Sequence, residues 1–214
     1  MVHYMSKPSP ARDVITDVAD RMFAERGVDE VSLREIVIES GQKNASAVQY
    51  YFGGRDGLFL AVFRRRLAKL NEVRSAYMET VDREGRGDDI RSLIEVSVFP
   101  LADYLRSATQ GSHYARFSAR MTPRVDFTSR DFADISDVSR EVIIRLRRAL
   151  VHLSEEAAAA RVDLIMNMIV SAFAAYEQRQ EEGLLSGAAS FDEMVTHLIE
   201  MAVGALTAPH SPGV

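Results

Sequence analysis

The segment "GQKNASAVQYYFGGRDGLF", residues 41–59, combines the pattern of a short helix with an unusual share of hydrogen-bonding side chains. Asn44 can cap this helix, and the Gly-Gly pair after it can end it. Its apolar face is formed by Ala47, Val48, Tyr51 and Phe52. The remaining positions carry Gln, Lys, Ser and Tyr, which a small core helix does not need. The segment is therefore expected to present a polar face to a binding partner.

The flanking residues predict further helices. Ser9-Pro10 supplies an N-cap and a first-turn proline, and apolar residues then recur at helical spacing until Gly27. The sequence "SLRE", residues 32–35, is a capping box that opens a second helix. A longer helix is expected over about residues 55–81. Two short helices joined by a tight turn, with an apolar helix behind them, form a helix-turn-helix, whose last helix enters the major groove of DNA.

The rest of the chain also has helical periodicity, so the predicted fold class is all-α. A charged segment with two glycines, residues 82–89, marks a break in composition where we expect a subdomain boundary. Further helices are expected over residues 90–107 (kinked or divided at Pro100), 113–121, 137–153, 154–181 and 190–206. The last of these is opened by a second capping box, "SFDE", residues 190–193.

Composition restricts the class of protein. No cysteine is present, which excludes disulfides and thiolate metal sites and fits the cytoplasm. The five histidines lie far apart, at no metal-ligand spacing, and no nucleophile motif occurs, so we expect no metal, no cofactor and no enzyme. The most apolar stretch, residues 157–176, is interrupted by Arg161, Asp163 and Asn167, so no transmembrane helix is predicted.

The formal net charge of −5 hides an asymmetry along the chain. Residues 1–66 carry 10 Lys and Arg against 9 Asp and Glu, whereas the remainder carries 16 against 22. Because the anionic excess lies in the later part, a basic surface near the N-terminus is compatible with this composition. The three arginines at residues 64–66 are expected to form a solvated helix face, and the alternative is a contact with DNA.

The segments "ITDVADRMFAERG", "VSLREIVIESG" and "VQYYFGGRDGLFLAV" together resemble the N-terminal DNA-binding region of the TetR family of transcriptional regulators, over about residues 14–62. Three features depart from the usual family pattern. Val37 replaces a small residue, and the turn before Phe52 is one residue longer than the commonest spacing. Tyr51 and Arg55 stand where His and Lys are usual. The resemblance implies a double-stranded DNA partner.

Base-edge chemistry and the resemblance together assign roles within this region. Asn and Gln suit adenine, and Lys suits guanine. The base-reading candidates are Lys43, Asn44, Ser46 and Gln49, with Ala45 in the same turn. The candidates for contacts with DNA phosphates, carried over by motif position, are Tyr50, Tyr51 and Arg55, and Ser32 and Arg34 are candidates for contacts with the DNA backbone. Two alternatives stay open: Asn44 as only a helix cap, and Tyr51 as only a packing residue.

The segment "DLIMNMIVSAFAAY", residues 163–176, is apolar on nearly every face of its predicted helix, so it must be covered on both sides. Together with the last helix it can form a surface that meets its own copy across a twofold axis, which is also the homodimer that the resemblance implies. The candidate interface residues are Leu164, Met168, Ala172, Ala175, Leu198 and Ala202. The alternative is the buried central helix of a monomer.

Aromatic and ionisable residues between these parts are candidates to line a ligand cavity. They are Phe99, Tyr104, His113, Arg116, Phe117, Arg120, Met121 and Phe127. A ligand there would be small and apolar or amphipathic, and an anionic group on it would pair with an arginine. The same aromatics could equally be plain core.

The sequence thus predicts a cytoplasmic, ligand-responsive homodimeric repressor that binds a palindromic operator, with no membrane association. The alternatives are a helical enzyme or a small-molecule-binding protein without DNA function. The expected domains are a flexible arm over residues 1–9, the helix-turn-helix domain over 10–60, a helical ligand-binding and dimerisation domain over 61–208, and a tail over 209–214.

Overall fold

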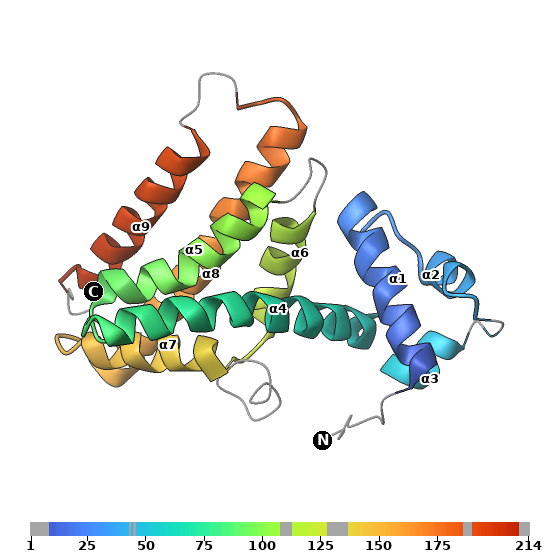
Figure 1. Cartoon of the computed structure of the whole chain (residues 1–214), viewed down its shortest axis with the longest axis horizontal. Helices are drawn as coiled ribbons and strands as arrows, with labels where there is room; N and C mark the ends of the chain where they lie inside the picture. The colour runs from blue at the N-terminus through green and yellow to red at the C-terminus, as the bar shows by residue number, and fades with distance from the viewer. Residues whose placement is uncertain are drawn as a thin grey trace, which may run out of the picture.

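The computed structural model describes residues 9–42, 44, 46–107, 113–127, 137–185 and 190–209, which fold into the helices drawn in Figure 1. The predicted arm and tail lie almost entirely outside these residues. The helices are α1 (Pro10–Arg26), α2 (Leu33–Glu39), α3 (Ala47–Phe52), α4 (Arg55–Arg83), α5 (Ile90–Ser107), α6 (Tyr114–Met121), α7 (Asp137–Ala149), α8 (Glu155–Glu181) and α9 (Phe191–Thr207), with a short 3-10 turn at Thr122–Arg124. The all-α fold class is confirmed for the described residues.

Capping boxes begin α2 and α9 as the sequence predicts. Before α2, Ser32 Oγ accepts a hydrogen bond from the Glu35 amide, and the Ser32 amide donates back to the Glu35 carboxylate. Ser190 and Glu193 make the same reciprocal pair before α9. Ser9 precedes α1, but its side chain makes no capping hydrogen bond.

Two helix boundaries differ from the predictions. α5 continues through Pro100 as one helix, so the proline does not divide it. α7 ends at Ala149 rather than near Leu153, because the next residues close two turns. In these turns the Leu150 amide bonds to the Arg147 carbonyl and the Leu153 amide to the Leu150 carbonyl.

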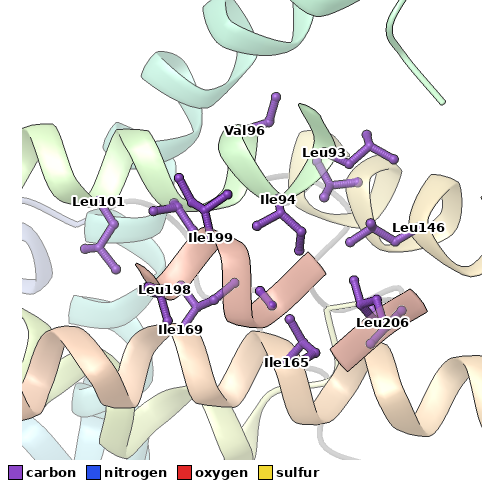
Figure 2. Close-up of a cluster of buried hydrophobic side chains, with 14 of the residues drawn as sticks. Leu93, Ile94, Val96, Leu101, Leu146, Ile165, Ile169, Leu198, Ile199 and Leu206 are labelled. Atoms are coloured by element: carbon purple, nitrogen blue, oxygen red, sulfur yellow. The ribbon is translucent and has the colours of Figure 1, made fainter. Parts of the chain in front are cut away.

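Two hydrophobic cores organise the chain. The first joins α1, α2 and α3 to the first half of α4, and it also takes in Phe117 and Met121 of α6. The second lies among α5, α7, α8 and α9, where Figure 2 shows Ile94, Leu146 and Ile199 converging with their neighbours. The charged segment 82–89 does not separate the two cores, because residues on both sides of it belong to the second core.

The cores instead share α4. In Figure 1 this helix leaves the group formed by α1, α2 and α3 and runs into the body that carries the second core. The first core contains Leu58, Phe59, Val62, Phe63 and Leu67 of α4, and the second contains Met78 and Val81. α4 therefore contributes side chains to both cores.

α8 is long and apolar enough to cross a membrane by length and composition alone. Its side chains Ile165, Ile169 and Phe173 are buried in the second core, and α8 packs on α6, α7 and α9. We therefore assign α8 to the core of a folded domain.

Candidate nucleic-acid interface and ligand cavity

α3 stands on the first core and leaves a polar face uncovered. Ala47, Val48 and Phe52 are buried against α4 and α2. Gln49 is exposed, and Tyr50 has 78% of its surface exposed, an uncommon position for a tyrosine. Tyr51 is half-buried and meets Tyr50 edge to face, with ring centroids 4.9 Å apart. Gln49 and Tyr50 thus form an exposed polar face of α3 that can contact a partner.

Asn44 shapes the turn before α3. Its Oδ1 accepts hydrogen bonds from the Ser46 amide at 2.9 Å and the Ser46 hydroxyl at 2.8 Å. Asn44 therefore stabilises the turn that leads into α3 but does not cap the helix, because Ser46 is the N-cap residue and its side chain makes no capping hydrogen bond. The amide nitrogen of Asn44 remains on an exposed side chain. Lys43 and Ala45 lie outside the described residues.

Arg55 is held by the loop between α1 and α2. Its Nη2 donates to the Val28 carbonyl at 2.8 Å and the Val31 carbonyl at 3.2 Å, and its guanidinium lies 4.8 Å from the centre of the Phe59 ring. Arg55 thus ties α4 to the α1–α2 loop, a role that the sequence did not indicate.

The start of α2 combines an exposed arginine with neutralised carboxylates. Arg34 is exposed, whereas the Ser32 hydroxyl is engaged with Glu35. Hydrogen bonds from the Ser32 side chain and backbone and from Arg26 lower the pKa of Glu35 to about 2. Glu39 is paired with Arg21 at 2.8 Å. Because both glutamates of α2 are paired with arginines, their repulsion of a phosphate backbone is reduced.

The predicted dimer residues divide into two groups. On α8, Leu164 is 67% exposed and Ala175 is exposed, while Met168 and Ala172 are half-buried. Leu198 and Ala202 of α9 are instead buried in the chain's own second core. Leu198 and Ala202 can therefore not contact a second chain directly, and they only support the dimer face from behind. The exposed side of α9 carries Met201, which is 62% exposed.

A cavity of about 90 Å³ lies between α4, α5, α6, α7 and α8. Its walls are largely apolar, and they include Phe63, Leu101, Tyr114 and Ile169, with Arg74 as the charged side chain. Of the predicted pocket residues, Phe127 lines this cavity.

The other predicted pocket residues lie elsewhere. Phe117 and Met121 belong to the first core. Phe99 packs against Tyr77, with ring centroids 5.9 Å apart, and Tyr104 packs outside Tyr114, at 4.1 Å. The sequence could not separate cavity wall from core here because both are apolar.

His113, Arg116 and Arg120 connect the two halves of the molecule. The His113 amide donates to the Ala24 carbonyl at the end of α1, and Arg120 forms an ion pair with Asp29. Arg116 pairs with Glu181 of α8. These backbone and side-chain contacts therefore hold α6 between α1 and α8.

Arg66 makes the most buried of these connections. Only 6% of its side chain is exposed, and it forms an ion pair with Asp20 of α1. Its guanidinium lies 4.7 Å from the Phe117 ring centre and 5.2 Å from that of Tyr114. Arg66 is thus not part of a solvated face. Because Tyr114 also lines the cavity, the cavity wall contacts the Arg66–Asp20 ion pair that joins α4 to α1.

No cluster of His, Asp or Glu that could hold a metal ion occurs within the described ranges. A family model described as bacterial regulatory proteins of the tetR family matches residues 15–62. A model of the tetracyclin repressor-like C-terminal domain matches residues 96–205, more than half of the chain.

Two curated relatives are repressors. The chain is 36% identical over 89 residues to the HTH-type transcriptional repressor AcnR of Corynebacterium glutamicum. It is 32% identical over 89 residues to the repressor of the same name from Corynebacterium efficiens. Each match covers 42% of this chain and 43% of the relative, so the similarity spans less than half of these relatives' length.

A solved structure shares the whole architecture. The fatty acid degradation regulator FadR from Bacillus halodurans superposes with a TM-score of 0.53 at 15% identity, and the match covers 94% of this chain and 99% of that one. At this identity the likeness establishes the fold alone.

Proposed function

Because the chain belongs to the tetR family of bacterial regulatory proteins, we propose that it is a DNA-binding transcriptional repressor, active as a homodimer on a palindromic operator and released by a small ligand. Family membership also makes the chain a regulatory protein rather than an enzyme. The observation that carries the proposal is the exposed polar face of α3, with Gln49 and Tyr50 standing out from the first core.

The division of labour on this face follows from side-chain chemistry. Gln49 and the amide of Asn44 can read base edges in the major groove, and we keep Lys43, Ala45 and Ser46 as candidates in the same turn. Tyr50, Tyr51 and Arg34 can donate to phosphate oxygens. Arg55 and Ser32 act by fixing the α1–α2 loop and α2, as their hydrogen bonds support.

A homodimer would place two copies of α3 on the same side of the duplex. Recognition helices one helical turn apart, about 34 Å, read successive major grooves of a palindrome. The exposed apolar side chains of α8 and α9, Leu164 and Met201, support such a contact because a lone chain leaves them in water. We propose Leu164, Met168, Ala172 and Ala175 as the α8 side of the interface.

Ligand response would run from the cavity to α1. Phe63 lines the cavity and belongs to the first core, and Tyr114 lines it and contacts Arg66. A ligand that alters either side chain shifts α4 or the Arg66–Asp20 link, and so changes the separation of the two recognition helices. We further propose the cytoplasm as the location of the protein, since it acts on DNA and carries no cysteine.

The first test is the selection of bound duplexes from a random pool, read at two salt concentrations with the full chain. We expect enrichment of a palindrome whose half-sites lie about one helical turn apart. Tyr50→Ala should weaken binding to every sequence, and Gln49→Ala should also change the preferred base. Val151→Ala, at a site that is 90% exposed and lies outside both the interface and the cavity, is the control and should change neither.

Two outcomes would count against the proposal. Absence of any enriched motif, together with small-molecule binding in the cavity, would favour a binding protein without DNA function. Equal effects of Tyr50→Ala and Gln49→Ala on all sequences would refute the assigned roles while leaving DNA binding intact.

A further inference from the structure

Arg74 is a buried cation in the wall of the cavity. It lies on α4, is 9% exposed, and reaches the space that Phe63, Leu67, Leu70 and Leu101 line. Desolvation by burial lowers the pKa of its guanidinium to about 10. A charged group in such surroundings is costly unless an opposite charge or several hydrogen bonds compensate it.

Its partners within the protein are neutral. Arg74 Nη1 donates to Asn71 Oδ1 and to Ser139 Oγ, the latter at 2.7 Å. The Ser139 hydroxyl in turn donates to Asn71 Oδ1 at 2.9 Å, so each of the three side chains is hydrogen-bonded to the other two. Among the residues that the structure describes, no carboxylate lies within ion-pair distance of Arg74.

These hydrogen bonds orient the guanidinium and leave one edge of it open. Both leave from Nη1, so the edge formed by Nη2 and Nε makes no hydrogen bond to the described residues. That edge is a fork of two parallel N–H groups, the geometry that matches the two oxygens of a carboxylate.

The remainder of the cavity offers little to a polar ligand. The Ser97 hydroxyl donates to the Leu93 carbonyl at 3.1 Å, and the Thr122 hydroxyl to the Ser118 carbonyl at 2.9 Å, so both serve their own helices. Most of the other lining side chains are apolar, from Leu101 on α5 to Ile143 on α7 and Ile169 on α8. A bound molecule therefore meets one cationic side chain and a wall that is mostly apolar, in which Tyr114 and Ser118 supply the other hydroxyl groups.

We propose that the cavity binds a small carboxylate with an apolar body, whose carboxylate pairs with the Nη2–Nε edge of Arg74 while Asn71 and Ser139 hold the guanidinium in place. This ligand class rests on the proposed function in that it treats the cavity as the effector site. The carboxylate supplies the negative charge that the described surroundings of Arg74 lack.

Isothermal titration calorimetry of the full chain, which measures the dissociation constants of matched probes, tests the proposal. The probes are octanoate against octan-1-ol and naphthalene-1-carboxylate against naphthalene-1-methanol, in which only the charged group differs. We expect the wild-type protein to bind at least one carboxylate about tenfold to a hundredfold more tightly than its alcohol, the range for hydrogen bonds to a charged group. Arg74→Met should abolish this preference and leave alcohol binding unchanged.

Arg140→Met is the matched control, because Arg140 is exposed and follows Ser139 directly on α7. It should keep the wild-type preference. Arg74→Lys, which keeps the charge but loses the fork, should lower the preference without abolishing it. If circular dichroism shows that Arg74→Met does not fold, the proposal is tested by the ratio of carboxylate to alcohol affinity in the wild type and in Arg74→Lys. A wild-type ratio near one, no carboxylate binding, or an unchanged ratio in Arg74→Lys would each overturn the proposal.

Binding of the selected operator duplex by the same preparations separates this inference from the proposed function. Operator binding without any carboxylate preference would overturn the ligand class and leave the repressor intact. A carboxylate preference that depends on Arg74, without operator binding, would support the ligand class and count against the repressor.

Discussion

At the scale of single residues, Arg55 illustrates how a motif position takes on a structural role. Its two hydrogen bonds to the Val28 and Val31 carbonyls connect segments far apart in the sequence. We predict that Arg55→Met lowers the free energy of unfolding by about 1–3 kcal/mol, because two carbonyls lose a charged donor. Tyr50→Ala, at an exposed site, should change it by less than about 0.5 kcal/mol. Urea denaturation measures both, and equal values would contradict the assignment.

Glu177 is a buried carboxylate with a defined pH signature. Desolvation raises the pKa of its carboxyl, although hydrogen bonds from the Arg116 and Ala115 amides at the start of α6 lower it in part. Since the folded state then holds the proton more tightly, Glu177 favours folding below its unfolded pKa, and this contribution is lost as the pH rises through the folded pKa.

The Glu177→Gln variant isolates this contribution because it does not titrate. The unfolding free energy of the wild type minus that of Glu177→Gln should decrease as the pH rises from about 4 to 6. Urea denaturation at several pH values measures the difference. A difference that is constant or increases over this range would show that the carboxyl is not destabilised by its burial.

At the scale of helices, α8 carries a buried side and an exposed apolar side. Leu164→Arg should weaken the proposed homodimer by on the order of 100-fold or more, since two unpaired charges would enter the interface. Sedimentation over a range of concentrations measures the dissociation constant. Val151→Arg is the control, because Val151 is 90% exposed and precedes α8. A Leu164→Arg dimer as tight as that of the control would place the interface elsewhere.

α4 carries two neighbouring arginines with different surroundings. Arg66 is buried with Asp20, whereas Arg65 pairs with Asp17 on the surface. We predict that Arg66→Met costs about 3 kcal/mol of unfolding free energy, because Asp20 loses its partner in a partly buried site. Arg65→Met should cost less than about 1 kcal/mol. Similar losses in both variants would mean that Arg66 is not a specific link between α1 and α6.

At the scale of the whole molecule, the charge distribution sets how DNA binding depends on salt. A neutralised phosphate contributes about 0.9 to the slope of log affinity against log salt. If Arg34 contacts one phosphate in each protomer, Arg34→Met should reduce the slope of a dimer by about 2. Lys69→Met, an exposed site further along α4, should leave it unchanged. An unaltered slope in Arg34→Met would remove Arg34 from the phosphate contacts.

Local sequence signals predicted much of the architecture. The capping boxes at Ser32 and Ser190 and the glycines after α3 act within a few residues, so the helix starts and the end of α3 follow from the sequence. The packing between helices that are distant in the sequence could not be predicted from these local signals. Arg66 lies in a run of three arginines, a pattern that predicts a solvated surface. It is buried because α1 and α6 pack against that side of α4.

The sequence by itself therefore determined the all-α class, the helix-turn-helix segment and the polar character of α3, because periodicity, caps and turn residues are local properties. Only the tertiary structure decided that Arg55 braces a loop, that Leu198 and Ala202 face inward, and that Arg74 rather than Arg116 or Arg120 lines the cavity. Apolar and basic residues look alike in a sequence whether they line a cavity, fill a core or join two helices. Their role is fixed by which distant helix covers them.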